Sequence, residues 1–213
     1  MTQDPFQTLI TDAQGFLTEL SQNNTRDWFQ AQKPRYDDTL KAPATALLDV
    51  ISADLERLAG APVAPKLFRP HRDVRFSKDK TPYHLHLHML WGVAGSTNTG
   101  YFFGVELDRV VLGAGCMGMQ GAALTAYRDR VAGNTGAALA TALDDLTTQG
   151  FRLNPPELKR VPSAFDKDHP RGALLRHKSL TCWQDMTKPP TDLRTALTEG
   201  FSALTPLMRW LQG

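Results

Sequence analysis

The sequence has little cysteine: only Cys116 and Cys182 occur among its 213 residues. Neither cysteine belongs to a CxxC pair, and two isolated thiols are too few to build a disulfide framework. A fold that depends on disulfides is therefore excluded. We predict that both side chains are reduced and are buried as small apolar groups.

Long apolar runs and a strong charge of one sign are also missing. No window approaches the roughly 18 consecutive apolar residues of a membrane span, and the first residues lack the basic and apolar regions of a signal peptide. We therefore expect no membrane partner and a cytoplasmic location. The net charge is only +2, so the chain lacks the wide basic surface that is typical of a dedicated nucleic-acid-binding protein.

Specific catalytic motifs are absent as well. The sequence contains no GxSxG elbow and no HExxH pair, and the stretch from Gly113 to Gly118 lacks the Lys-Ser/Thr ending of a phosphate-binding P-loop. We interpret these glycines as permitting close backbone packing at the end of a strand. The sequence accordingly leaves the cofactor unknown, and it leaves a catalyst and a pure binding protein equally open.

The fold class follows from the order of the apolar patterns. With 41% hydrophobic and 22% charged residues, we expect residues 1–213 to form one globular domain. Helical spacing predicts helices at 5–20, from about 25, and at 40–59, 120–131, 135–148 and 191–211. Extended patterns predict strands at 66–69, 72–76, 85–91, 101–107 and 110–117. Helices, then strands, then helices indicate an α+β fold, with a largely antiparallel sheet and N-terminal and C-terminal helices packed on it.

One segment concentrates positive charge. Residues 66–80 contain six Lys or Arg and two Asp, a net +4 in a chain of only +2. On a strand over 72–76, Arg72 would share the core face with Val74 and Phe76, and it would need an acidic partner from the helices. Arginine and lysine side chains on one loop can surround an anion, and a solvated basic loop is the competing interpretation. The expected ligand-binding residues are Arg69, Arg72, Arg75, Lys78 and Lys80, with Lys159 and Lys178 as outlying contributors.

Three histidines, His84, His86 and His88, alternate with leucine along a predicted strand. Neighbouring histidines would lie roughly 6.5–7 Å apart, so two of them could bind one metal with help from elsewhere, such as Glu106 or His169. No specific ligand spacing supports a metal. The alternative interpretation is a polar strand face that adds to the basic basin.

Three parts of the chain together resemble the DUF2461 family. They are Asn23-Asn24, Arg26, Trp28-Phe29 and Tyr36; the run from Phe68 to Tyr83 with His86; and Leu158-Lys-Arg-Val-Pro162, Phe165-Asp166, His169-Pro170 and Lys178-Ser179. This family is named for its unknown function. The resemblance therefore implies a single α+β domain in a bacterial cytoplasmic protein, and it implies no reaction or cofactor. It also favours His86, because the family usually has a lysine where this chain has His84.

The leading prediction is a basic pocket for a small ligand that carries a phosphate or a carboxylate. His86 is the candidate catalytic residue, as a proton donor or acceptor, and phosphoester hydrolysis or transfer would suit arginine clamps. One alternative is a metal-dependent hydrolase that uses the His84/His86/His88 strand. A nucleic-acid or protein interaction module is the other, and the oligomeric state is not predicted.

Overall fold

The computed structural model describes residues 6–96 and 98–213. Within these residues one six-stranded sheet has the order β1-β2-β3-β4-β6-β5, and every neighbouring pair is antiparallel. The strands are β1 (Val63–Leu67), β2 (His86–Val93), β3 (Thr99–Glu106), β4 (Val110–Cys116), β5 (Arg152–Leu153) and β6 (Leu180–Asp185). A hairpin turn at Asp108-Arg109 joins β3 to β4, and the predicted α+β class with a largely antiparallel sheet is confirmed.

Helices precede the sheet, interrupt it and end the chain. The first group is α1 (Leu9–Gln22), α2 (Arg26–Arg35), the π-helix η1 (Tyr36–Lys41) and α3 (Ala42–Ala59). The others are α4 (Gly121–Ala132), α5 (Gly136–Thr148), α6 (Gly172–Leu175), α7 (Leu193–Ala203) and α8 (Thr205–Gln212). In the described part of the chain, none of these helices combines the length and the apolar character needed to cross a membrane.

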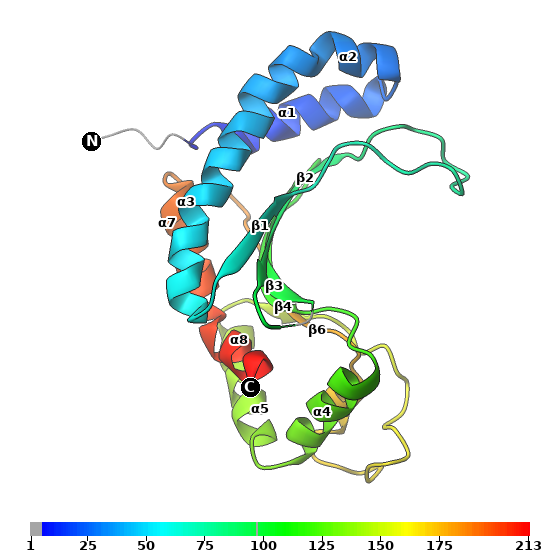
Figure 1. The fold of residues 1–213 in the computed structure, drawn as a ribbon, viewed down its shortest axis with the longest axis vertical. Helices are drawn as coiled ribbons and strands as arrows, with labels where there is room; N and C mark the ends of the chain where they lie inside the picture. The colour runs from blue at the N-terminus through cyan, green and yellow to red at the C-terminus, as the bar shows by residue number, and fades with distance from the viewer. Residues whose placement is uncertain (1–5, 97) are drawn as a thin grey trace.

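The sheet is curved, and α1, α3, α7 and α8 pack behind it on the convex side (Figure 1). The connection between β1 and β2, residues 68–85, projects at one end of the curve. Residues 154–179 lie at the other end, beside α4. In the part of the chain that the structure describes, no helix covers the concave face between these two ends, so side chains on this face are left for another role.

Strand β2 shows how the sequence separates the two faces. Its side chains alternate between buried and half-buried along the whole strand, as expected for a strand that is covered on one side. The buried set faces the helices, and within it the Trp91 indole Nε1 donates a 3.0 Å hydrogen bond to the Leu48 carbonyl of α3. The half-buried set, on the concave face, is His86, His88, Leu90 and Gly92.

Two predicted elements are wrong. Residues 72–76 form a loop in which Phe76 is 96% exposed, because side chains in the loop satisfy its backbone: Asp73 accepts from Arg75 N at 3.2 Å. The single C-terminal helix predicted over 191–211 is two helices that meet at Leu204, just before Pro206. The first helix begins at Leu9, and the predicted start at Pro5 lies outside the described residues.

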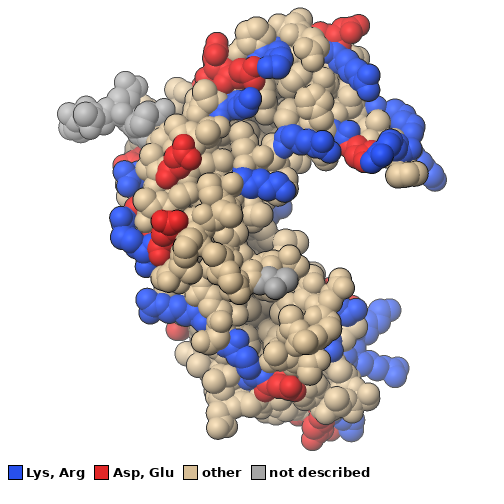
Figure 2. Space-filling model, in the orientation of Figure 1, with Lys and Arg blue, Asp and Glu red and all other residues tan. Residues whose placement is uncertain are grey.

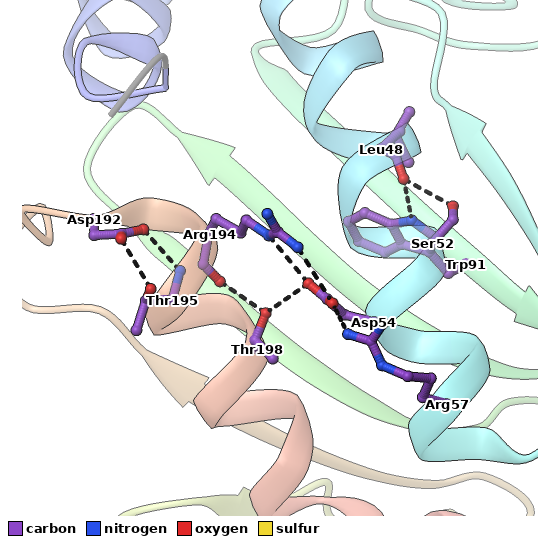
Figure 3. A network of polar contacts seen from close by, with 9 residues as sticks. All are labelled: Leu48, Ser52, Asp54, Arg57, Trp91, Asp192, Arg194, Thr195 and Thr198. Carbon is purple, nitrogen blue, oxygen red and sulfur yellow. Dashed lines mark hydrogen bonds and ion pairs between the residues drawn. The ribbon is translucent and has the colours of Figure 1, made fainter. Parts of the chain in front are cut away.

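A polar cluster around Asp54 joins α3 to α7 behind the sheet (Figure 3). Asp54 is 5% exposed and accepts hydrogen bonds from Arg194 Nε at 3.2 Å and from Thr198 Oγ1 at 3.3 Å. Arg57, one turn along α3, is a third partner. Burial alone raises the pKa of Asp54, but the hydrogen bond and charge of Arg194 outweigh it, so the pKa is lowered. The carboxylate is therefore charged in the folded protein at neutral pH.

Replacing Asp54 by asparagine should lower the free energy of unfolding at pH 7 by about 1–2 kcal/mol, because Arg57 and Arg194 keep their charges but lose the opposite charge of the carboxylate. Urea denaturation measures this directly. Asp49→Asn is the matched control, because Asp49 lies on the same helix and is exposed. An equal loss in both variants would contradict a role for the α3–α7 contact.

Candidate functional site on the concave face

Residues 68–85, which we call the basic loop, are anchored to the N-terminal helices. Asn24 binds both backbone groups of Tyr83: its side chain donates to Tyr83 O at 3.0 Å and accepts from Tyr83 N at 3.1 Å. The Tyr83 ring is buried and stacks on Phe29 of α2, with 4.0 Å between ring centroids. A bridge between His71 and Tyr83 ties the two arms of the loop together. The basic loop is thus an ordered extension of the sheet.

Most cations of the basic loop are paired within the loop itself. Arg72 Nη1 lies 2.5 Å from Asp79 Oδ2, Arg75 Nη2 lies 2.7 Å from Asp73 Oδ2, and Lys80 Nζ donates to a backbone carbonyl. A backbone hydrogen bond from Thr81, followed by the Arg72 side chain, lowers the pKa of Asp79 to about 2. The prediction that a helix supplies the acidic partner of Arg72 is wrong, since the partner comes from the loop.

Two cations of the loop remain available to a ligand. Arg69 and Lys78 are both exposed, and neither makes a hydrogen bond or an ion pair with any residue in 6–96 or 98–213. Lysine and arginine side chains gather at this end of the molecule, above the hollow of the concave face (Figure 2). The basic loop therefore presents positive charge at one rim of the concave face.

The three histidines form a ladder of rings that begins beside the basic loop. The His84 and His86 ring centroids are 4.7 Å apart, and His86 stacks on His88 at 3.5 Å. Burial, followed by the charges of Arg72 and Arg69, lowers the pKa of His84. His84 N donates a 2.7 Å hydrogen bond to the carbonyl of Pro70, so the backbone next to Arg69 lies beside the start of the ladder. Burial, with smaller effects from neighbouring histidines, lowers the pKa of His86 and of His88 to about 4. All three rings are therefore neutral at pH 7.

The ladder is incompletely hydrogen-bonded. His86 Nδ1 and His88 Nε2 are buried without a hydrogen-bond partner among the described residues. His88 Nε2 lies 3.4 Å from Glu106 Oε1, but the contact lacks hydrogen-bond geometry, and it is an ion pair only when His88 is protonated. Unsatisfied buried nitrogens cost stability, and such costs are concentrated at functional sites.

Aromatic contacts continue from the ladder across the sheet. The His88 ring packs edge-on against Phe102 of β3 at 4.9 Å, and Phe102 packs against Trp183 of β6 at 5.4 Å. Glycines make room for these rings. A Cβ on Gly104 would lie within 3 Å of both the Phe102 and His88 rings, and a Cβ on Gly113 would lie 2.5 Å from Trp183. The ring contacts therefore run unbroken from the basic loop to the far side of the concave face.

Beyond these rings, glycine residues leave the backbone of the strands uncovered by side chains, and this backbone forms the floor of the concave face. Gly92 on β2 pairs with Gly100 on β3, and Gly100 pairs with Gly115 on β4, so three glycines lie in one row across the strands. Phe102 and Trp183 stand beside this row. Together they line an open cavity of about 710 Å³ whose exposed lining is mostly apolar. Such a mixture of apolar surface and a few polar groups is typical of small-molecule sites.

The structure separates the two outlying lysines from the basic loop. Lys159 lies in the segment at the opposite end of the curved sheet, where it lines a second cavity. Lys178 is exposed and precedes Ser179, which lines the glycine-floored cavity. Predicted ligand-binding residues thus occupy three places: the basic loop, the far rim of the concave face and the second cavity.

A metal centre finds little support in this geometry. Among the described residues, no group of three or more His, Cys, Asp or Glu side chains is arranged to hold a metal ion. His86 and His88 stack face to face with 7° between their ring planes, and Glu106 approaches His88. Two histidines and one carboxylate could supply the three protein ligands of a catalytic zinc site, but the nitrogen lone pairs of parallel stacked rings do not point at a common ion.

Comparison with known proteins agrees with the motifs. The family model described as a conserved hypothetical protein, DUF2461, matches residues 12–210. The chain belongs to the DUF2461 family. No curated protein matches it. In this DUF2461 protein, the matched region contains the basic loop, the histidine ladder, the concave face and the second cavity.

The aromatic surface of the concave face in this DUF2461 protein was not identified from the sequence. Phe102 and Trp183, which form it, are both half-buried. The available signal was glycine on alternate positions of β3 and β4, Gly100, Gly104, Gly113 and Gly115. Alternate glycines indicate a strand face with little side-chain cover, but they do not show which distant strand lies beside it.

Proposed function

We propose that the concave face binds a small ligand that carries a phosphate or a carboxylate on a flat apolar body. The observation that carries this proposal is the unbroken series of ring contacts from the basic loop to the glycine-floored cavity. Cations lie at one end of this series and apolar surface lies at the other. A ligand with a negatively charged group at one end and an apolar body at the other would bind to both parts of the concave face.

The anionic group belongs at the end formed by Arg69, Arg72 and His84. Arg69 has no competing ion pair there, and an arginine fork can bind a carboxylate or a phosphate with two hydrogen bonds. Arg75, Lys78 and Lys80 lie further out in the loop, where their charge would attract an anion rather than contact it.

The body of the ligand belongs over the row of glycines, beside Phe102 and Trp183. His86 and Leu90 are four residues apart, about 13 Å along a strand, so a nucleotide-sized ligand would be long enough to reach the cavity from the ladder. Apolar and aromatic surfaces favour a planar group by stacking. Lys178 would stand at the far rim of the cavity.

His86 is the proposed proton acceptor or donor for a bound ligand. A ring with a pKa of about 4 is uncharged at pH 7 and can accept a proton, and a nearby anion would raise that pKa. This role would make phosphoester hydrolysis or transfer the reaction class, with the arginines offsetting developing charge.

A nucleoside monophosphate, a planar body with one phosphate, is the first probe. At about 100 times its dissociation constant it should stabilise the wild-type protein by roughly 2.7 kcal/mol relative to chloride at matched ionic strength. Gly92→Leu should weaken binding at least tenfold, about 1.4 kcal/mol. A Cβ on Gly92 meets no atom within 4 Å, so the new side chain would fill the cavity without disturbing the fold.

Arg69→Gln with His84→Gln should weaken binding similarly by removing the anionic end of the site. Arg26→Gln, at an exposed arginine on α2, is the control and should bind as the wild type does. Undiminished affinity in Gly92→Leu would reject the cavity. A single-stranded oligonucleotide that binds with a steep salt dependence would instead favour the nucleic-acid alternative, for which exposed Phe76 offers a stacking surface.

A further inference from the structure

The second cavity lies at the end of the molecule opposite the basic loop. It has a volume of about 510 Å³ and is lined by residues 159–161, 167, 169, 170, 172, 173 and 176. Its charged lining consists of Lys159, Arg160, Lys167 and Arg176, together with His169. We propose that this cavity is a second, separate anion site that binds a phosphate group.

The charge of this segment is unusual for the chain. Residues 159–178 contain six Lys or Arg and two Asp, a net +4 that equals the charge of residues 66–80. Since the whole chain carries +2, the residues outside these two segments sum to −6. Within residues 6–96 and 98–213, no aspartate or glutamate lines the cavity, and Lys167 alone of its cations forms an ion pair. Because clustered cations repel one another, the remaining charge favours an external anion.

The walls of the cavity are held in place by groups that do not take part in the site. Leu158 N donates to Arg176 O at 3.1 Å, which joins the two sides of the cavity. Arg171 points away and donates to the carbonyls of Val131 and Ala132 at 2.6 and 2.9 Å, which fastens the segment to the end of α4. These hydrogen bonds therefore hold the backbone segments that carry the cations in a fixed arrangement around the cavity.

One lining residue has its hydrogen-bonding role set by the backbone. His169 Nδ1 accepts a 3.0 Å hydrogen bond from Arg171 N, so the proton of the neutral ring lies on Nε2. His169 can therefore donate a hydrogen bond through Nε2 while the cations supply charge. Donors without acceptors suit the oxygens of a phosphate group, whether free or carried by a monoester.

A competing carboxylate lies just outside the cavity. Asp168 Oδ2 is 2.9 Å from Lys167 Nζ, and both side chains are largely exposed. The Asp168 carboxylate therefore partly neutralises the charge of Lys167. Removing the Asp168 charge should therefore release Lys167 to the anion and strengthen binding, which is the opposite of the effect expected from removing a cation.

Titration of the full chain with inorganic phosphate, followed by calorimetry, tests the site. Phenyl phosphate in a second titration distinguishes a monoester from free phosphate as the preferred ligand. Lys159→Gln with Arg160→Gln should weaken phosphate binding about tenfold or more, since each charge-assisted bond contributes about that factor. Both side chains are exposed and make no hydrogen bond with a described residue, so the fold should persist. Asp168→Asn should strengthen binding several-fold.

Two control variants keep this site distinct from the concave face. Arg69→Gln with His84→Gln should leave phosphate affinity at the second cavity unchanged, and so should Arg26→Gln with Lys188→Gln, which removes an equal charge elsewhere. Absence of phosphate binding to the wild type at millimolar concentration would overturn the proposal. Equal loss in the cavity variant and in the Arg26/Lys188 control would also overturn it, by showing attraction to net charge alone. Failure of the nucleoside monophosphate to bind the concave face would not affect this result.

Discussion

Replacing Gly115 by alanine is expected to destabilise the protein by about 4 kcal/mol or more, enough to prevent folding in many single domains. A Cβ on Gly115 would lie 2.1 Å from the Leu180 carbonyl oxygen and 2.6 Å from Thr181 Cα, both on the backbone of β6. Its φ of +149° is also one that L side chains rarely adopt. Backbone strain and overpacking each cost about 1–3 kcal/mol, and here they act together.

Gly92→Ala is the matched control, because Gly92 lies in the same row of glycines on the same face. A Cβ there has no atom within 4 Å. Alanine at position 92 should therefore change the free energy of unfolding by less than about 1 kcal/mol, with stabilisation as the expected sign. Urea denaturation followed by circular dichroism separates the two variants. Similar losses at both positions would show that the row of glycines serves the fold alone.

The contrast between these two glycines bears on the function of the concave face. Gly115 is required by the close approach of β4 and β6, whereas nothing in the packing requires a glycine at position 92. A glycine without a structural reason, half-buried on the open face of a sheet, leaves space that a ligand can occupy. Gly92 is thus the residue at which a structural role and a binding role are most clearly separated.

Local patterns were sufficient to predict most elements of the fold. The alternation from Leu85 to Trp91 predicted a strand covered on one side, and β2 has that alternation along its whole length. Helices α4 and α5 begin and end within a few residues of the predicted positions. In each of these segments, burial and local propensity favour the same structure, so the sequence pattern is a reliable guide.

The errors occur where side chains make polar contacts that a period cannot reveal. Residues 72–76 have the alternation of a strand, but Asp73 and Asp79 bind the backbone and the arginines of the loop. Arg72, for which a partner on a helix was predicted, is paired with Asp79 of the same loop, and Arg75 is paired with Asp73. Local pairing of this kind depends on side-chain geometry, which hydrophobic period does not encode.

The candidate site on the concave face was predicted only in part, because some of its residues are far apart in the sequence. The basic loop and the histidine ladder are contiguous in sequence, and both could be identified. Phe102 and Trp183 come together through strands β3, β4 and β6, whose register joins residues about 80 positions apart. Lys159 was assigned to the same basin as the basic loop, but the curvature of the sheet places it at the opposite end (Figure 1). Long-range register and curvature are properties of the assembled sheet.

The histidine ladder should make the stability of this protein unusually sensitive to mild acid. An unfolded histidine binds a proton below about pH 6.5, whereas His86 and His88 in the folded chain bind one only near pH 4. Between these values the unfolded state holds more protons. Stability that is fully present above pH 6.5 is therefore lost as the pH falls towards 4.

The expected loss between pH 7 and pH 5 is about 3 kcal/mol for the pair, given about 1.4 kcal/mol per pKa unit and a reduction for partial exposure. Unfolding in urea at the two pH values measures it. His86→Gln with His88→Gln should remove the part of this pH dependence that comes from the pair, whereas His84 and His177, whose pKa values burial also lowers, retain theirs. His71→Gln, at an exposed histidine, should retain it.

A double variant that loses as much stability as the wild type between pH 7 and pH 5 would show that the two rings are protonated normally in the folded protein. The same measurement with a ligand present connects stability to the proposed function. An anion bound beside the ladder favours the charged imidazole, so it should raise the pKa of His86 and reduce the loss of stability at pH 5. Proton uptake on binding would then distinguish an anion that lies against the histidines from one held by the basic loop alone, because arginine and lysine remain protonated throughout.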